Sequence, residues 1–192
     1  MRRLGIAAAA LSFAAILSPA LAYEVIDPLT HQPIATFQED ARTMATAIPR
    51  ETVDYNGPYG AGTIIVSTKE RRLYYVLGNG KALKYGVGVG RPGFAWGGSK
   101  TITRKAEWPG WTPPPQMLKR RPDLPKYMPG GPENPLGARA LYIGSTLYRI
   151  HGSNEPDTIG QAVSSGCIRM MNEDVIDLYA RVKVGARVVV QR

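Results

Sequence analysis

The chain has 192 residues and a formal net charge of +9, and 44% of its residues are hydrophobic. This length suits one domain with a sizeable core and is short for two. One cysteine and two histidines are too few for a structural zinc site, which takes about four nitrogen or sulfur ligands. We therefore expect no metal and no other cofactor.

Residues 1–22 have the order of a secretory signal peptide: two arginines, an apolar run over 4–17, and a small-residue site that ends at Ala22. The apolar run is shorter than the roughly 20 residues that span a membrane. We therefore expect cleavage after Ala22, export to the periplasm and no transmembrane segment in the mature chain. Loss of Arg2 and Arg3 leaves a formal charge of +7. A basic exported protein suits an acidic envelope polymer and not a nucleic acid, although the charge also fits an ordinary solvated surface.

Residues 23–59 are predicted to form an N-terminal extension, because they hold several prolines and few periodic apolar positions. A short helix is expected within it over 38–47. His31 lies in a turn-like context between prolines and is interpreted as a surface histidine.

From residue 60 the pattern changes to β-branched and aromatic runs divided by short glycine and asparagine turns, which is typical of strands. The first three runs predict an antiparallel meander. We expect a mainly β catalytic domain over 60–192, built as a β-sandwich or a curled mixed sheet. The expected strands are 63–68, 72–77, 82–89, 100–107, 140–150 and 187–191.

The segment 88–93 formally matches the dinucleotide-binding fingerprint, Gly-x-Gly-x-x-Gly. That motif binds phosphate at the start of a helix, and the residues that follow it here do not form a helical pattern. Nucleotide binding is therefore not expected. The glycines are interpreted as a bend or a close backbone approach near a site.

Residues 108–137 contain too many prolines for a helix or a central strand. A loop of this length inside a compact domain is usually functional or disordered, and its aromatic residues favour a function. We interpret it as a flap that covers a substrate, with Trp108, Trp111 and Tyr127 as walls. An irregular loop held by its aromatic side chains is the alternative.

The chemistry is expected at Cys167, the single thiol, with His151 as its base. A thiol with a pKa of about 8.5 is mostly protonated at neutral pH, and imidazole is the usual partner that activates it. Gly166 allows a sharp turn that points the backbone N–H groups of Ser165, Gly166 and Cys167 at one spot, as an oxyanion hole does. An exported thiol without an intramolecular partner serves catalysis or intermolecular pairing. The alternative is a small buried side chain beside a core histidine.

One short helix is predicted after the thiol, with Asn172 as its N-cap and an apolar stripe that packs on the sheet. The stripe is Val175, Leu178, Tyr179 and Val182. Arg169, two residues past the thiol, is expected on the same side of an extended segment, within reach of a substrate carboxylate. Its alternative is an ion pair with Glu173 or Asp174.

The segments His151-Gly152-Ser153 and 164–170, Ser-Ser-Gly-Cys-Ile-Arg-Met, resemble the signature of the L,D-transpeptidase catalytic domain (YkuD type). The resemblance extends upstream to 62–66 and 85–91 and covers roughly residues 60 to 191. It departs from the pattern at Ser165, where many members have a second histidine.

This resemblance implies a peptidoglycan transpeptidase. Cys167 attacks a tetrapeptide stem, the terminal D-Ala leaves, and an acceptor amine resolves the thioester, while the carbonyl of Gly152 orients the ring of His151. The acceptor is another stem peptide or the amine of an outer-membrane or other envelope protein. Two alternatives stay open: a cysteine peptidase or amidase (L,D-carboxypeptidase) of the wall, and a non-catalytic wall-binding module.

Overall fold

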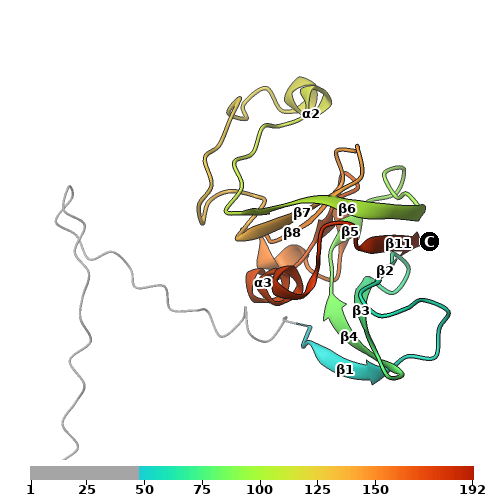
Figure 1. Ribbon diagram of the computed structural model, residues 1–192. Coiled ribbons are helices and arrows are strands. Elements are labelled where there is room, and N and C mark those ends of the chain that lie inside the picture. The colour runs from blue at the N-terminus through green and yellow to red at the C-terminus, as the bar shows by residue number, and fades with distance from the viewer. Residues whose placement is uncertain (1–47) are drawn as a thin grey trace, which may run out of the picture. The chain divides into compact units, whose positions relative to one another are not determined.

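The computed structural model describes residues 48–192. The predicted signal peptide, the helix expected over 38–47 and His31 lie outside the described residues. Figure 1 shows a curled sheet with helix α3 on one side and a long flap, which carries helix α2, on the other.

The prediction of a mainly β fold with a curled mixed sheet is confirmed. Within residues 48–192, nine strands form one sheet in the order β1-β4-β3-β2-β11-β6-β7-β8-β10, and two strands, β5 and β9, form a second. The strands of the large sheet are β1 Glu51–Asp54, β2 Ile64–Ser67, β3 Arg72–Gly78, β4 Lys81–Gly86, β6 Gly98–Glu107, β7 Arg139–Ile143, β8 Arg149–His151, β10 Ile168–Arg169 and β11 Arg187–Gln191. The strands of the small sheet are β5 Val89–Gly90 and β9 Ala162–Ser164.

The expected meander is present, because β2 pairs antiparallel with β3 and β3 with β4. Strand β11 then joins the two halves of the sheet: it pairs parallel with β2 and antiparallel with β6. The valines 188–190 of β11 are buried, which explains why this strand is a continuous apolar run without alternation.

The single strand expected over 140–150 is wrong. The segment is a hairpin in which β7 and β8 pair antiparallel. Its turn uses Gly144 at a positive φ of 56°, and Thr146 Oγ1 donates a hydrogen bond of 2.6 Å to the carbonyl of Ile143. The sheet also begins earlier than expected, since β1 lies within the predicted extension and pairs with β4.

Helix α3, Asn172–Arg181, packs its apolar stripe on the sheet, with Val175 and Leu178 fully buried. The prediction of Asn172 as N-cap is wrong: the cap position is Met171, and no side chain caps the helix. Asn172 instead lies in the first turn, where its Oδ1 accepts a bond from the N–H of Ala138 (2.9 Å) and its Nδ2 donates to the carbonyl of Ser153 (3.1 Å). The side chain thus ties the start of β7 to the loop after His151.

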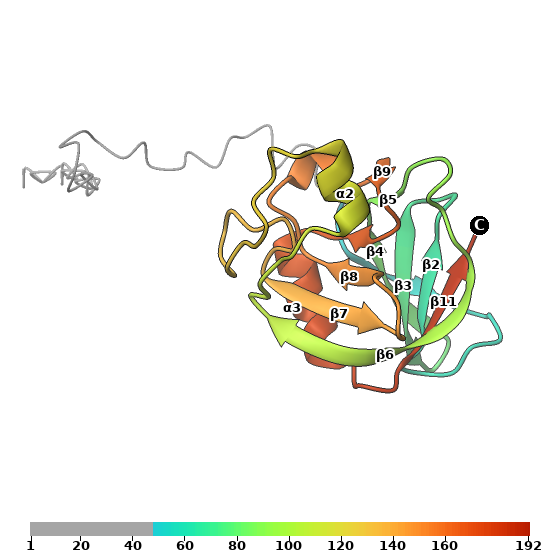
Figure 2. The ribbon, with the colours of Figure 1, turned by 90° about the horizontal axis from the view of Figure 1, so that it is seen from above.

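The flap is not free of helix, and that prediction was wrong as well. Helix α2, Pro115–Arg120, lies in its middle. A proline in the first turn of a helix costs little, because that N–H has no intrahelical partner in any case. The N–H groups of Trp111 and Met128 each donate 2.8 Å bonds to the other residue's carbonyl and draw the two arms of the flap together. Seen from above, α2 projects over the region of β8 and β9 (Figure 2).

Asp174, buried in the first turn of α3, provides a test of this packing. Burial raises its pKa to about 6, so the folded protein favours the protonated form, and the contribution of this group to the free energy of unfolding falls as pH rises from about 4 to about 6. We expect Asp174→Asn to raise the free energy of unfolding at pH 7 by on the order of 1 kcal/mol, and by much less near pH 4. Urea unfolding at both pH values measures this.

Asp177 on the same helix is the matched control, because its hydrogen bond with Arg181, followed by that with Tyr85, lowers its pKa. Asp177→Asn is expected to destabilise the protein at pH 7. Equal effects of the two substitutions would contradict the assignment of burial as the dominant influence on Asp174.

Candidate active site

A cavity of about 460 Å³ lies between the flap and the turn that carries Cys167. Its walls come from the flap, the β7–β8 turn, strand β8 and the segment around the thiol. They include the three residues expected at the site from the sequence, Cys167, His151 and Arg169. They also include two arginines that were not expected there, Arg120 and Arg149. None of the lining residues within 48–192 is acidic, so the cavity suits an anionic ligand.

Cys167 lies half-buried on the wall, in the turn between β9 and β10. The turn needs Gly166 because its φ of 106° is one that residues with a Cβ rarely adopt. Ser164 holds the turn from inside, since its Oγ donates to the carbonyl of Cys167 (2.6 Å) and accepts the N–H of Gly166 (3.1 Å). The Sγ of Cys167 is 3.7 Å from the carbonyl oxygen of Leu147.

Trp96 braces this turn from the other side. Its Nε1–H donates a 2.8 Å bond to the carbonyl of Gly166, and its ring stacks on Tyr148 with 4.7 Å between the centroids. Sequence reasoning missed both residues. The available signal was a tryptophan among glycines at 93–98, where an aromatic ring has little local structure to pack on.

His151 is the last residue of β8 and is 4% exposed. Its Nδ1 lies 2.6 Å from the carbonyl oxygen of Gly152. A carbonyl only accepts, so Nδ1 carries the proton in this contact, and Nε2 is the unprotonated nitrogen of the ring. This is the contact expected from the resemblance, and it gives the ring the tautomer of a base.

Burial keeps both groups of the pair neutral. Burial lowers the pKa of His151 to about 3, helped by Arg169 and Arg149 and opposed by backbone hydrogen bonds with Gly152 and, to a smaller extent, Leu136. Burial raises the pKa of Cys167, and the nearby Arg149 opposes that shift. At neutral pH the site therefore holds a thiol and a neutral imidazole.

Two of the three backbone N–H groups expected to form an oxyanion hole are free. The N–H of Gly166 is taken by Ser164 Oγ. The N–H groups of Ser165 and Cys167 have no acceptor among residues 48–192. These two donors, on either side of the turn, remain candidates for an oxyanion next to the sulfur.

Arg169 forms an ion pair, but with Glu155 and not with the partners considered from the sequence. Its Nη1 is 2.6 Å from Glu155 Oε2 and 3.3 Å from Thr158 Oγ1. Glu173 and Asp174 follow Arg169 closely in sequence but belong to the helix that turns away under the sheet. Arg169 nevertheless lines the cavity.

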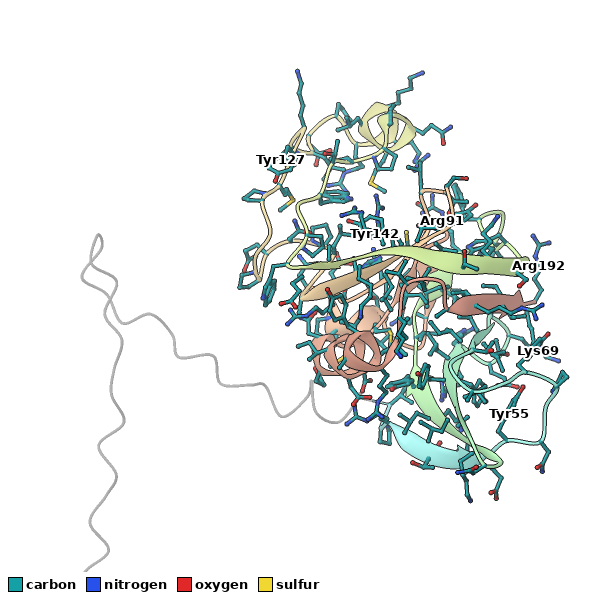
Figure 3. The ribbon with its side chains drawn as sticks, in the orientation of Figure 1. Tyr55, Lys69, Arg91, Tyr127, Tyr142 and Arg192 are labelled. Carbon is teal, nitrogen blue, oxygen red and sulfur yellow. The ribbon has the colours of Figure 1, made fainter. Side chains whose placement is uncertain are left out.

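Of the three aromatic residues expected as walls, one lines the cavity and two do not. Trp111 lines the cavity, together with Met117 and Arg120 of helix α2. Trp108 and Tyr127 are not among the lining residues and are 44% and 60% exposed. Figure 3 labels Tyr127 on the flap and Tyr142 on the face of the sheet that is turned toward the flap.

A half-buried thiol, a buried imidazole with an unprotonated nitrogen, and unpaired backbone donors that line one cavity are typical of cysteine enzymes that transfer acyl groups. Residues 61–190 match the family described as L,D-transpeptidase catalytic domain, YkuD. The chain belongs to this family.

Two curated relatives have similar sequences. The chain is 42% identical over 134 residues to a probable L,D-transpeptidase, ErfK/SrfK, of Escherichia coli. The matched region covers 65% of this chain and 42% of that protein. The chain is 32% identical over 188 residues to a putative L,D-transpeptidase of Fuscovulum blasticum, over 96% of this chain and 92% of that one. The chain thus spans less than half the length of the first of these relatives.

Solved structures share the fold. L,D-transpeptidase 3 of Mycobacterium tuberculosis superposes with a TM-score of 0.52 at 18% identity, over 68% of this chain and 60% of that one. A Brucella melitensis structure named a probable carnitine operon oxidoreductase is 44% identical, with a TM-score of 0.51 over 75% of this chain and 94% of that one. That name belongs to the other protein and is not transferred to this chain.

The part of the chain that the structure describes contains no helix that is long and apolar enough to cross a membrane.

Proposed function

We propose that this chain is a peptidoglycan L,D-transpeptidase with Cys167 as its nucleophile. The observation that carries the proposal is that the thiol and the imidazole line the same cavity, inside the segment that matches the family. The donor is a stem peptide whose terminal D-Ala is released. The acceptor is an amine, either of another stem peptide or of an envelope protein, and the site of action is the periplasm.

In the first step, Nε2 of His151 takes the thiol proton as Cys167 Sγ forms a bond to the donor carbonyl carbon. The carbon–nitrogen bond to D-Ala then breaks, and the imidazolium returns the proton to the leaving amine. The low pKa of His151, about 3, makes the imidazolium a strong acid that gives this proton up readily. The free N–H groups of Ser165 and Cys167 are placed to hold the oxyanion between these events.

In the second step the acceptor amine attacks the thioester carbonyl, loses a proton to His151, and displaces the thiol. The apolar part of the cavity, with Trp111, Met117 and Leu136 on its walls, supports this outcome, because water excluded from a thioester leaves time for an amine to attack. Hydrolysis differs only in that water replaces the amine.

Mass spectrometry of the reaction tests the proposal directly. The mature protein is incubated with a purified tetrapeptide-bearing muropeptide, alone and with a second amine. We expect a protein adduct equal to the donor minus D-Ala, followed by a cross-linked product. Donor hydrolysed without any cross-link would identify a carboxypeptidase, and neither adduct nor product would favour a binding module.

Arg169 is proposed to bind a carboxylate of the donor, as its place on the cavity wall allows. Arg169→Ala removes a charge-assisted contact of about 1.5 to 3 kcal/mol, so kcat/KM is expected to fall about tenfold to a hundredfold. The thiol is still expected to react normally with a small neutral alkylating agent at high pH.

Glu155→Gln is the matched control for Arg169, because it keeps the guanidinium but removes its ionic partner at 2.6 Å. We expect this variant to bind the donor at least as well as the unmodified protein. If both substitutions lowered the melting temperature and kcat/KM to the same extent, the ion pair would be structural and Arg169 would have no role in binding.

A further inference from the structure

Arg149 shares a cross-strand row with the thiol. It is opposite Tyr142 in the β7–β8 pair. In the parallel β8–β10 pair, Ile150 is beside Ile168 and His151 beside Arg169, so the same register places Arg149 next to Cys167. Side chains two apart on a strand share a face. Arg149 therefore points to the cavity side, as His151 does, and it lines the cavity.

The guanidinium of Arg149 is only partly satisfied. Its Nη1 donates a 3.2 Å bond to the carbonyl of Leu147, and its Cζ lies 5.2 Å from the ring centroid of Tyr142. Its Nε is buried and has no hydrogen-bond partner. Within residues 48–192 no carboxylate forms an ion pair with it. A buried donor without an acceptor is rare and asks for an explanation.

The thiol and this guanidinium use the same acceptor. The carbonyl oxygen of Leu147 is 3.7 Å from Cys167 Sγ and 3.2 Å from Arg149 Nη1. Once the sulfur has lost its proton it has nothing to donate to that carbonyl, and two electron-rich atoms face each other. The guanidinium of Arg149, which already donates to the Leu147 carbonyl, is positively charged and has an unpartnered Nε–H.

We propose that Arg149 is the counter-ion of the Cys167 thiolate, with its Nε–H taking the place of the Leu147 carbonyl as the partner of the sulfur. No bond is broken in Arg149 and it carries its charge throughout. In the resting protein the thiol proton goes to solvent, and during acyl transfer it goes to Nε2 of His151. The inference rests on the proposed thiol chemistry and adds a residue to it.

Other charged groups near the sulfur act differently. Arg169, on β10, is neutralised by Glu155, and Arg120 belongs to the flap helix α2. His151 is a neutral base in the resting site. The direction of the pKa shifts agrees: among the influences that lower the pKa of Cys167 against the effect of burial, Arg149 is the largest and Arg169 is minor.

The test is the pH dependence of alkylation of the full chain by iodoacetamide, a neutral reagent, from about pH 6 to about pH 10. For Arg149→Gln we expect the profile to move up by at least one pH unit, so that the rate at pH 8 falls about tenfold and recovers at high pH. Arg149→Lys keeps the charge but loses the Nε–H, and its profile is expected between the two. If the glutamine variant does not fold, the lysine variant alone must show the upward shift.

Arg104→Gln is the matched control, because Arg104 also stacks on Tyr142, with its Cζ 3.5 Å from the ring centroid, but comes from β6, which flanks β7 on the side opposite β8. It removes one charge and one stacking contact and is expected to leave the profile unchanged. The proposal is overturned if Arg149→Gln leaves the profile where it was, lowers the rate by the same factor at every pH, or shifts it no more than Arg104→Gln. The assay needs no peptidoglycan, so its result is independent of whether the chain transfers stem peptides.

Discussion

Replacing Cys167 by serine is expected to abolish transfer while leaving the fold intact. A serine hydroxyl has a far higher pKa than a thiol, so the neutral imidazole of His151, with its pKa lowered to about 3, takes the hydroxyl proton far less readily during attack. Among residues 48–192 no carboxylate forms a hydrogen bond or ion pair with the ring, whose Nδ1 faces the Gly152 carbonyl. The acyl adduct measured by mass spectrometry should disappear, and less than about one hundredth of the turnover should remain.

The matched control for this variant is its thermal unfolding. The serine hydroxyl fits the space of the half-buried thiol, and the turn is held by the Gly166 backbone and Ser164, so the melting temperature should change little. A carbapenem has a strained ring that acylates thiols of this kind. We expect it to increase the mass of the unmodified protein by one carbapenem molecule and to leave the mass of Cys167→Ser unchanged. Substantial turnover by the serine variant would remove Cys167 from the nucleophile position.

Replacing His151 by alanine is expected to lower turnover at neutral pH by several powers of ten. Because burial raises the pKa of Cys167, the thiol needs a base that takes its proton during attack. The rate of alkylation by a neutral reagent should approach that of the unmodified protein only at high pH. Turnover should not recover to the same degree, because the leaving amine still lacks its proton donor.

His31→Ala is the control for this substitution, since it removes the other histidine of the chain. We expect it to have the turnover of the unmodified protein at every pH. A His151→Ala variant that kept full turnover at high pH would limit the role of His151 to deprotonating the thiol.

The residues that carry chemistry by their type could be predicted from the sequence. A single thiol, a histidine nearby in the chain and a glycine in the turn before the thiol are recognisable without coordinates. Arg149 could not be recognised in this way, although it precedes His151 by only two residues. Its position next to Cys167 depends on the register between β8 and the two-residue strand β10, and a strand of that length has no periodic pattern to detect.

The flap shows the other limit of sequence reasoning. Prolines at this density exclude a long helix, but they do not exclude a single turn or two that begins at a proline, as α2 does at Pro115. Which aromatic residue of the flap faces the cavity depends on how its two arms pair through Trp111 and Met128. That pairing brings together residues far apart along an irregular segment, so Trp111 could not be distinguished from Trp108 or Tyr127 beforehand.

The way the flap joins the sheet bears on how such domains diversify. Strands β6 and β7 are neighbours, and their last paired residues are Glu107 and Arg139, which also form a 3.1 Å ion pair. The N–H of Trp108 donates to the carbonyl of Ala138 at 2.8 Å and closes the base of the flap. The flap is therefore an insertion in a β-hairpin, and doubling the length of such a loop costs only about 0.6 kcal/mol in closure entropy. The flap, and with it the substrate specificity, can therefore change in evolution while the strands that hold the thiol and imidazole stay unchanged.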